Sequence, residues 1–171
     1  MARNIEIKAV CHDRRATRER IEVRAGAAVA ELHQDDSFFG CTTGRLKLRD
    51  FGNGRAELIA YERPDTPEPS LSSYTRVETD DPAGLRATLT RALGCWARVI
   101  KTRHLYLAGR TRIHLDQVER LGDFVELEVV LEAHEPPGDG RREAERLMDE
   151  LGIEPTDLCA IAYADMLAAK R

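Results

Sequence analysis

The sequence predicts an α+β fold in which helices cover the outside of a closed antiparallel β barrel. Two features of the 171 residues lead to this prediction: charged residues alternate with apolar ones in several strand-like segments, and other segments carry apolar residues at helical spacing. Because every second side chain of a strand lies on the same face, each such strand has one charged face and one apolar face. A sheet with its polar face in solvent accounts for any one of these strands. A barrel with the charged faces inward accounts better for all of them, because like charges on one strand can then meet opposite charges from another.

Alternation of charged and apolar residues recurs along most of the chain, and glycine-rich turns separate some of the segments. Gly52-Asn53-Gly54 predicts a hairpin, and Gly109 predicts a second chain reversal. Residues 64–72 are rich in proline and are predicted to form a loop. The alternating segments are, in chain order, residues 4–8, 45–49, 57–63, 73–78, 101–105, 112–116 and 124–129.

Four segments have the apolar spacing of helices that pack against a sheet. One begins at Asp81-Pro82 and extends to Trp96, and another includes residues 144–151. A third is predicted to begin at Pro155 and to continue through residue 162. Residues 14–32 show a weaker helical pattern, which a glycine and two β-branched residues interrupt. These apolar stripes are predicted to pack against the strands rather than to bind a ligand.

Length and composition indicate one domain. The hydrophobic content of 42% is typical of globular chains, and 171 residues are enough to bury a sizeable core. We expect residues 1–133 to form most of the barrel strands with their covering helices. Residues 138–171 are expected to form a C-terminal helical part of the same domain.

The charge balance and the apolar pattern argue against two classes of partner. The chain has 26 Lys+Arg and 30 Asp+Glu, a net charge of -4, whereas nucleic-acid-binding chains are usually strongly basic. No apolar run is long enough to cross a bilayer, and the first residues lack the apolar segment of a signal peptide. The four cysteines are scattered without zinc-ligand spacing, as is common in reducing compartments. We therefore expect a cytoplasmic protein that binds neither nucleic acid nor membrane.

Cations from many strands would converge inside such a barrel, where they suit a polyanion. Lys and Arg bind phosphate oxygens through charge-assisted hydrogen bonds, and Arg can do so with two nitrogens at once. A triphosphate is therefore the predicted ligand of the interior. The candidate substrate-binding residues are Lys8, Arg45, Lys47, Arg49, Arg63, Arg76, Lys101, Arg103 and Arg112.

Carboxylates on other strands would offer a divalent cation its preferred ligands. Glu126 and Glu128 share one strand face, and Glu6 and Asp116 lie in strands predicted to face the same interior. Oxygen ligands of this kind suit Mg²⁺ or Mn²⁺, and a bound metal would let carboxylates and phosphates share one cavity. His114 is either a general base or proton shuttle, or a hydrogen-bonded residue of the lining.

Glu6-Ile7-Lys8 resembles the ExExK signature of the CYTH superfamily, the triphosphate tunnel metalloenzymes. This superfamily includes class IV adenylyl cyclases, thiamine triphosphatases and inorganic triphosphatases. The resemblance covers nearly the whole chain. It implies an eight-stranded antiparallel β tunnel that holds a triphosphate among basic residues, with a metal bound by acidic residues at one side. The other segments that follow in family order are residues 34–39, 46–49, 61–64, 101–103, 113–116 and 124–128.

The resemblance also implies roles for individual residues, and Asn4 is the one clear departure from the signature, because it stands at the first acidic position. An amide oxygen can ligate a metal but brings no charge, so a second metal would bind less tightly. The implied metal ligands or their neighbours are Glu6, Asp116, Glu126 and Glu128. The implied phosphate contacts are Lys8, Lys47, Arg49, Arg63 and Arg103, followed by Arg45, Arg76, Lys101 and Arg112. The expected catalytic group is Lys8, Arg49, Arg103 and His114.

Together these features predict a Mg²⁺- or Mn²⁺-dependent enzyme that acts on a triphosphate such as ATP, inorganic triphosphate or thiamine triphosphate. Hydrolysis is favoured over cyclisation of ATP to cyclic AMP and pyrophosphate, because hydrolysis needs no nucleobase pocket and no aligned ribose. A non-catalytic module that binds nucleotides or polyphosphate is a further alternative. The chain could act as a monomer or as a homodimer.

Overall fold

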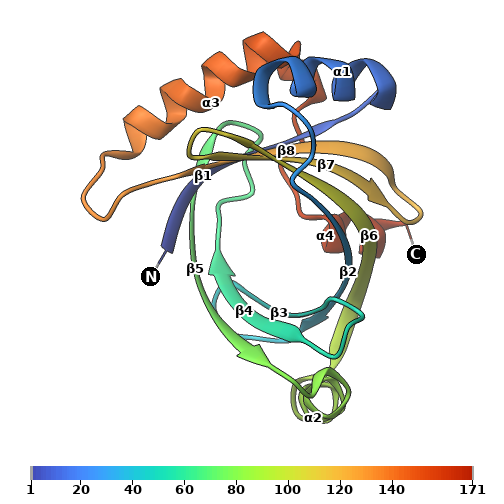
Figure 1. Cartoon of the computed structure of the whole chain (residues 1–171). Helices are drawn as coiled ribbons and strands as arrows, with labels where there is room; N and C mark the ends of the chain where they lie inside the picture. The colour runs from blue at the N-terminus through green and yellow to red at the C-terminus, as the bar shows by residue number, and fades with distance from the viewer. Residues whose placement is uncertain (1, 171) are drawn as a thin grey trace.

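The computed structural model describes residues 2–170, and within them eight antiparallel strands close into a barrel (Figure 1). Around the barrel the strands follow one another in the order β1-β5-β4-β3-β2-β6-β7-β8. The strands are β1 (Ala2–Val10), β2 (Ala30–Phe39), β3 (Arg45–Asp50), β4 (Ala56–Glu62), β5 (Ser70–Thr79), β6 (Cys95–Ala108), β7 (Thr111–Val118) and β8 (Gly122–Val130). The predicted α+β fold, an eight-stranded antiparallel barrel with helices outside it, is thereby confirmed.

Helices cover two opposite sides of the barrel and one of its ends. Figure 1 shows α1 and α3 together over β1, β7 and β8, and α2 on the far side next to β2 and β3. The short helix α4 is seen within the outline of the barrel, where it contacts β6. The helices are α1 (Arg14–Ala25), α2 (Pro82–Leu93), α3 (Pro137–Leu151) and α4 (Tyr163–Ala169), with a 3-10 helix, η1, at Pro155–Asp157.

The apolar core lies outside the barrel wall, between the strands and the helices. Ile7 of β1, Leu115 of β7 and Leu127 of β8 are almost completely buried, and they pack in one cluster with Ile21 of α1 and Leu147 of α3. Burial of such side chains contributes about 1.5–3 kcal/mol each. Since alternate residues point the opposite way, the charged faces of the same strands are directed into the barrel. The expectation of a charged interior is therefore correct.

The two predicted chain reversals are present. The hairpin between β3 and β4 has Gly52 and Gly54 at positive φ, and the side chain of Asn53 accepts a hydrogen bond from the backbone N–H of Arg55. Gly109, between β6 and β7, also has positive φ. Glycine has no Cβ to clash in this conformation, which explains why these positions turn the chain.

Two predicted helices are longer than the real ones. The pattern in residues 14–32 is helical only through Ala25, because Gly26 ends α1 with positive φ and residues 30–32 pair with β6. Trp96 is on strand β6, not on α2, since the helix ends at Gly94, whose N–H donates to the carbonyl of Thr90.

Two further boundaries are corrected by pairing with β1. The predicted loop at residues 64–72 ends earlier, because Ser70 is opposite Glu6 and begins β5. The helix predicted from Pro155 is only the 3-10 turn η1. The chain then runs beside the end of β1, where Leu158 forms an isolated bridge with Ala9, and α4 starts at Tyr163.

None of the helices within residues 2–170 is long and apolar enough to cross a membrane.

Candidate active site

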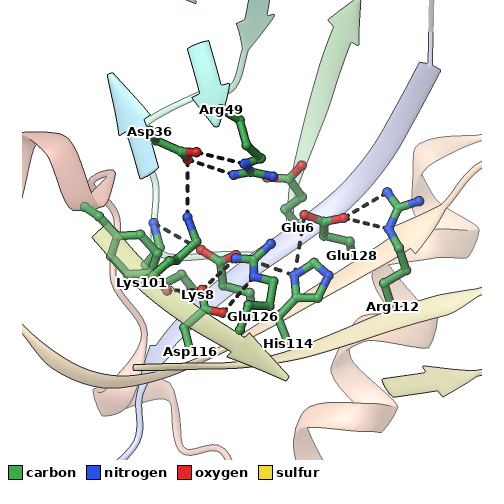
Figure 2. Close-up of polar contacts among 12 residues, drawn as sticks. Glu6, Lys8, Asp36, Arg49, Lys101, Arg112, His114, Asp116, Glu126 and Glu128 are labelled. Atoms are coloured by element: carbon green, nitrogen blue, oxygen red, sulfur yellow. Dashed lines mark hydrogen bonds and ion pairs between the residues drawn. The ribbon is translucent and has the colours of Figure 1, made fainter. Parts of the chain in front are cut away.

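The barrel encloses a cavity of about 310 Å³, which is within the size range of small-molecule sites. Two groups of ionisable side chains face each other across it, as Figure 2 shows for most of them. We call Lys47 and Arg49 of β3 with Lys101 and Arg103 of β6 the basic wall. Opposite, the acidic wall comprises Glu6 of β1, His114 of β7, and Glu126 and Glu128 of β8.

A single carboxylate neutralises much of the basic wall. Asp36 of β2 is only 1% exposed, and its oxygens accept two hydrogen bonds of 2.8 Å from Arg49. The same carboxylate accepts a hydrogen bond from Lys47 Nζ at 3.0 Å and one from Lys101 Nζ at 3.2 Å (Figure 2). Asp36 thus holds three cations from two strands in one place, and each of them also lines the cavity.

Burial shifts the pKa values of the basic wall. Burial alone would raise the pKa of Asp36, but Arg49, Lys101 and Lys47 outweigh it and hold that pKa well below its usual range. For Lys101, burial dominates and lowers the pKa to about 7, since the attraction of Asp36 is offset by Arg49, Arg103 and Lys47. The wall therefore holds more cationic groups than one carboxylate can satisfy, which favours binding of an anion.

Arg103 is held at the boundary between the two walls. Its Nε and Nη2 donate to both oxygens of Asp116 at 2.7 and 2.6 Å, and Nη2 also donates to Glu126 Oε2. Tyr163 of α4 donates a further hydrogen bond of 3.1 Å to Asp116 Oδ2. Asp116 is fully buried, and both of its oxygens accept hydrogen bonds. This geometry favours a role for Asp116 in positioning Arg103, while its expected place among the metal ligands or their neighbours stays a prediction.

The acidic wall brings three carboxylates and an imidazole together. In the strand register Glu6 is opposite Glu128, and His114 is opposite Glu126. Burial and the neighbouring charge of Glu128 raise the pKa of Glu6 to about 7, although Arg63 opposes this shift from 3.9 Å. Neighbouring cations outweigh burial at Glu126 and Glu128 and lower their pKa values, so Glu6 is the carboxylate of this wall with the least compensating positive charge.

Asn4 and Arg112 are next to the acidic wall. Arg112 donates to Glu128 Oε2 at 2.8 Å (Figure 2). With the Asn4 amide oxygen turned toward it, Arg112 Nη2 also donates to Asn4 at 3.0 Å. The neutral side chain at position 4 therefore accommodates a guanidinium that is bound to Glu128.

The segment before α4 borders the cavity. Lys8 Nζ donates to the carbonyl of Ile161 at 3.3 Å, and Arg63 donates to the carbonyl of Ala160 at 2.9 Å. Lys8 Nζ is also 4.1 Å from the centre of the Tyr163 ring and 3.6 Å from Glu126. Both cations thus connect the C-terminal segment to the barrel interior.

The remaining two predicted cations are at the margins of the cavity. Arg45 is paired with Asp65 and Asp165, each at 2.9 Å, and the largely exposed Arg76 is paired with Glu57 at 3.3 Å. Both line the cavity, but each already has a carboxylate partner.

The structure therefore brings nearly all of the predicted site residues into one cavity, and Asp116 lies directly behind it. Sequence reasoning missed two residues of the site, Asp36 and the hydroxyl of Tyr163. Asp36 had a usable signal, because it alternates with Gln34 and Phe38 on one strand face, and all three line the cavity. Tyr163 had no such signal, since the hydrogen bond of its hydroxyl to Asp116 depends on the path that the C-terminal segment takes past the barrel.

The CYTH domain family matches residues 2–163, and the chain belongs to this family. No curated protein matches it. Among solved structures, the PH1012 protein from Pyrococcus horikoshii OT3 has a TM-score of 0.84 at 22% identity, with 95% of this chain and 98% of that chain covered.

Two similar structures have names that mention an activity. A candidate adenylate cyclase from Vibrio parahaemolyticus has a TM-score of 0.75 at 16% identity, with 96% of this chain and 97% of that one covered. HpAC1 from Hippeastrum, a candidate adenylyl cyclase with a dominant triphosphatase activity, has a TM-score of 0.61 at 16% identity and coverage of 99% and 96%. At these identities the likeness establishes the fold alone.

Proposed function

We propose that this protein is a divalent-metal-dependent triphosphatase that releases orthophosphate from a nucleotide or another organic or inorganic triphosphate. The observation that carries the proposal is the pairing of the two walls: four cations, of which Arg103 also contacts Glu126, line the same cavity as three carboxylates and an imidazole. Membership of the CYTH family and the triphosphatase activity named for HpAC1 support the same reaction class.

The residues of the acidic wall fit a divalent cation. One ligand atom from each of His114, Glu126 and Glu128 lies within 4.8 Å of the others, and the Glu6 carboxylate is opposite Glu128. These residues would hold Mg²⁺ or Mn²⁺, which when bound neutralises phosphate charge and orients a nucleophilic water. Among these carboxylates a cation would most favour the ionisation of Glu6, whose pKa burial raises to about 7, since neighbouring cations outweigh burial and already lower the pKa values of Glu126 and Glu128.

The basic wall would bind the phosphates and stabilise the charge of the transition state. Lys47, Arg49 and Lys101 can exchange the Asp36 carboxylate for phosphate oxygens without leaving their positions, because Asp36 already gathers them. Arg103 is fixed by Asp116, so its guanidinium is directed before the substrate arrives. In phosphoryl transfer such positioning and charge neutralisation supply most of the catalysis.

Lys8 and Arg63 extend this set toward the C-terminal segment. Both side chains are buried, and both donate to carbonyls of that segment. A terminal phosphate that reached this part of the cavity would meet two further cations. We therefore propose that the substrate binds with its terminal phosphate toward Lys8 and Arg63.

Product analysis tests this proposal. The purified chain is incubated separately with ATP, inorganic triphosphate and thiamine triphosphate, each with Mg²⁺, with Mn²⁺ and with chelator. Metal-dependent release of orthophosphate is the expected result. Cyclic AMP with pyrophosphate would identify a cyclase instead, and tight, metal-independent binding without any product would identify a binding module.

A further inference from the structure

His114 has an unsatisfied nitrogen at the centre of the acidic wall. The residue is 4% exposed, and its buried Nδ1 has no hydrogen-bond partner within residues 2–170. Nδ1 lies 3.6 Å from Glu126 Oε2 and 3.7 Å from Glu128 Oε1, and Figure 2 shows the ring directed at these two side chains. Both separations are too long for a hydrogen bond. A buried polar atom left without a partner is uncommon and calls for an explanation.

These separations match those of ligands that share one metal ion. Nitrogen and oxygen ligands bind a divalent metal such as zinc at about 2.0–2.2 Å, so two of them can be at most about 4.4 Å apart. The distances from Nδ1 to both carboxylates fall below that limit. The register explains how the chain achieves this: His114 and Glu126 are directly opposite on β7 and β8, and Glu128 is two residues further along the same face.

Arg112 limits how much of this wall a metal can use. Its guanidinium donates to Glu128 Oε2 and to the amide oxygen of Asn4. It therefore occupies the space between Glu128 and Asn4. Glu128 therefore has Oε1, the oxygen nearest His114, available for a cation. Because the guanidinium already supplies positive charge on one side of Glu128, we expect a single ion, beside His114.

We propose that His114 Nδ1, one oxygen of Glu126 and one oxygen of Glu128 form a site for a single metal ion, and that the imidazole makes the site select Mn²⁺ over Mg²⁺. Imidazole suits transition metals, whereas Mg²⁺ prefers an all-oxygen set. This assigns His114 to metal binding rather than to proton transfer. The proposal rests on the metal requirement in the proposed function and adds the choice and number of ions.

The test measures Mn²⁺ on the full-length chain with no triphosphate present. Electron paramagnetic resonance gives the number and affinity of bound Mn²⁺ ions, competition gives the affinity for Mg²⁺, and electron spin echo modulation detects a directly bound nitrogen. We expect one Mn²⁺ per chain, bound more tightly than Mg²⁺, with a clear nitrogen signal.

Two histidine variants give the comparison. His114→Asn places an amide oxygen near the Nδ1 position, so the nitrogen signal should disappear and Mn²⁺ affinity should fall at least about tenfold, with a smaller change for Mg²⁺. His33→Asn is the matched control, because His33 is exposed on β2 and should leave all of these values unchanged. Thermal unfolding and metal-free binding of inorganic triphosphate show whether each variant is folded.

The outcomes separate this proposal from the proposed function. A single Mn²⁺ with the nitrogen signal, in a chain that hydrolyses no triphosphate, supports the metal site and contradicts the function. Hydrolysis that proceeds equally with both ions, without nitrogen coupling in the wild type, supports the function and overturns the metal site. Two equivalent Mn²⁺ ions per chain would overturn the role given to Arg112.

Discussion

The two walls of the cavity are each paired with charges of the opposite sign, but to different extents. Beside the basic wall one carboxylate, Asp36, is shared by three cations at 2.8–3.2 Å. In the acidic wall Glu126 and Glu128 have cationic partners, while Glu6 has only Arg63 at 3.9 Å. The basic wall is thus gathered around a carboxylate that a phosphate can replace, and the acidic wall retains carboxylate charge that a metal can neutralise.

The largest effect is expected on the acidic wall. Glu126→Gln combined with Glu128→Gln removes two carboxylates from the proposed metal site while keeping their shape. Metal stabilisation is worth several kcal/mol, so metal-dependent release of orthophosphate should fall by about 10³-fold or more. A phosphate-release assay measures this loss. Glu19→Gln, on the exposed surface of α1, is the matched control. Intact product formation in a folded double variant would mean that the metal site is elsewhere.

The next effect concerns the carboxylate within the basic wall. Asp36→Asn leaves Lys47, Arg49 and Lys101 buried without their shared counter-charge. Removal of one partner from such a buried group costs about 3 kcal/mol or more, so the free energy of unfolding should fall by that amount. Denaturant titration measures it. Inorganic triphosphate should stabilise this variant more than the wild type, since it restores the missing negative charge. Equal stabilisation of both proteins would show that phosphate does not take the place of Asp36.

A smaller effect is expected from one cation of the same wall. Arg49→Ala removes the guanidinium that binds Asp36 through two hydrogen bonds. Hydrogen bonds to charged groups contribute about 1.5–3 kcal/mol, which corresponds to a loss of about tenfold to 150-fold in affinity for inorganic triphosphate. Isothermal titration calorimetry gives this value. Arg55→Ala, in an exposed pair with Glu78, should bind as the wild type does. Unchanged affinity in Arg49→Ala would contradict the assignment of the basic wall.

The smallest effect is a dependence on pH. Burial lowers the pKa of Lys101 to about 7, while in the unfolded chain the lysine keeps its proton up to its ordinary pKa of 10.5. Between these values the native state binds fewer protons, so the contribution of Lys101 to the free energy of unfolding becomes more favourable as pH rises. Triphosphate binding favours charged Lys101 and should therefore weaken above about pH 7, by at most about tenfold per pH unit.

Lys101→Arg isolates this effect, because an arginine stays charged throughout the range. The affinity of each protein for inorganic triphosphate is measured from pH 6 to 8.5. The ratio of the wild-type affinity to that of Lys101→Arg is then independent of the protonation of the ligand, because both proteins bind the same ligand. That ratio should fall as pH rises. Parallel curves would show that Lys101 remains charged in the cavity.

The sequence predicted the barrel and its charged interior because both follow from local alternation. Lys47 and Arg49 could be placed inside the barrel, since a period of two fixes which residues share a face. Asp36 was not selected, because it follows Asp35, and its alternation with Gln34 and Phe38 shows a shared face without showing that this face points inward. The pairing of β2 with β3 and β6 decides that question.

Long-range contacts account for the other differences. Asp116 has the same alternation as His114 and was predicted to be a metal ligand or a neighbour of one, but the sequence did not show that it is paired opposite Arg103 on β6 and binds this guanidinium with both oxygens. Residues 158–162 were predicted to be helical, but they are extended because they lie against the end of β1, where Cys159 N–H donates to the carbonyl of Lys8. Neither contact can be predicted from the residues next to it in the sequence, because both join segments that are distant along the chain.

A crystal structure of the chain with a non-hydrolysable triphosphate analogue and Mn²⁺ tests the central claim most directly. The anomalous signal of manganese locates the ion independently of the phosphates. We predict manganese between His114, Glu126 and Glu128, with phosphate oxygens on Lys47, Arg49 and Lys101 in place of Asp36. An analogue bound outside the barrel, or phosphates that leave Asp36 bound to all three cations, would contradict the account.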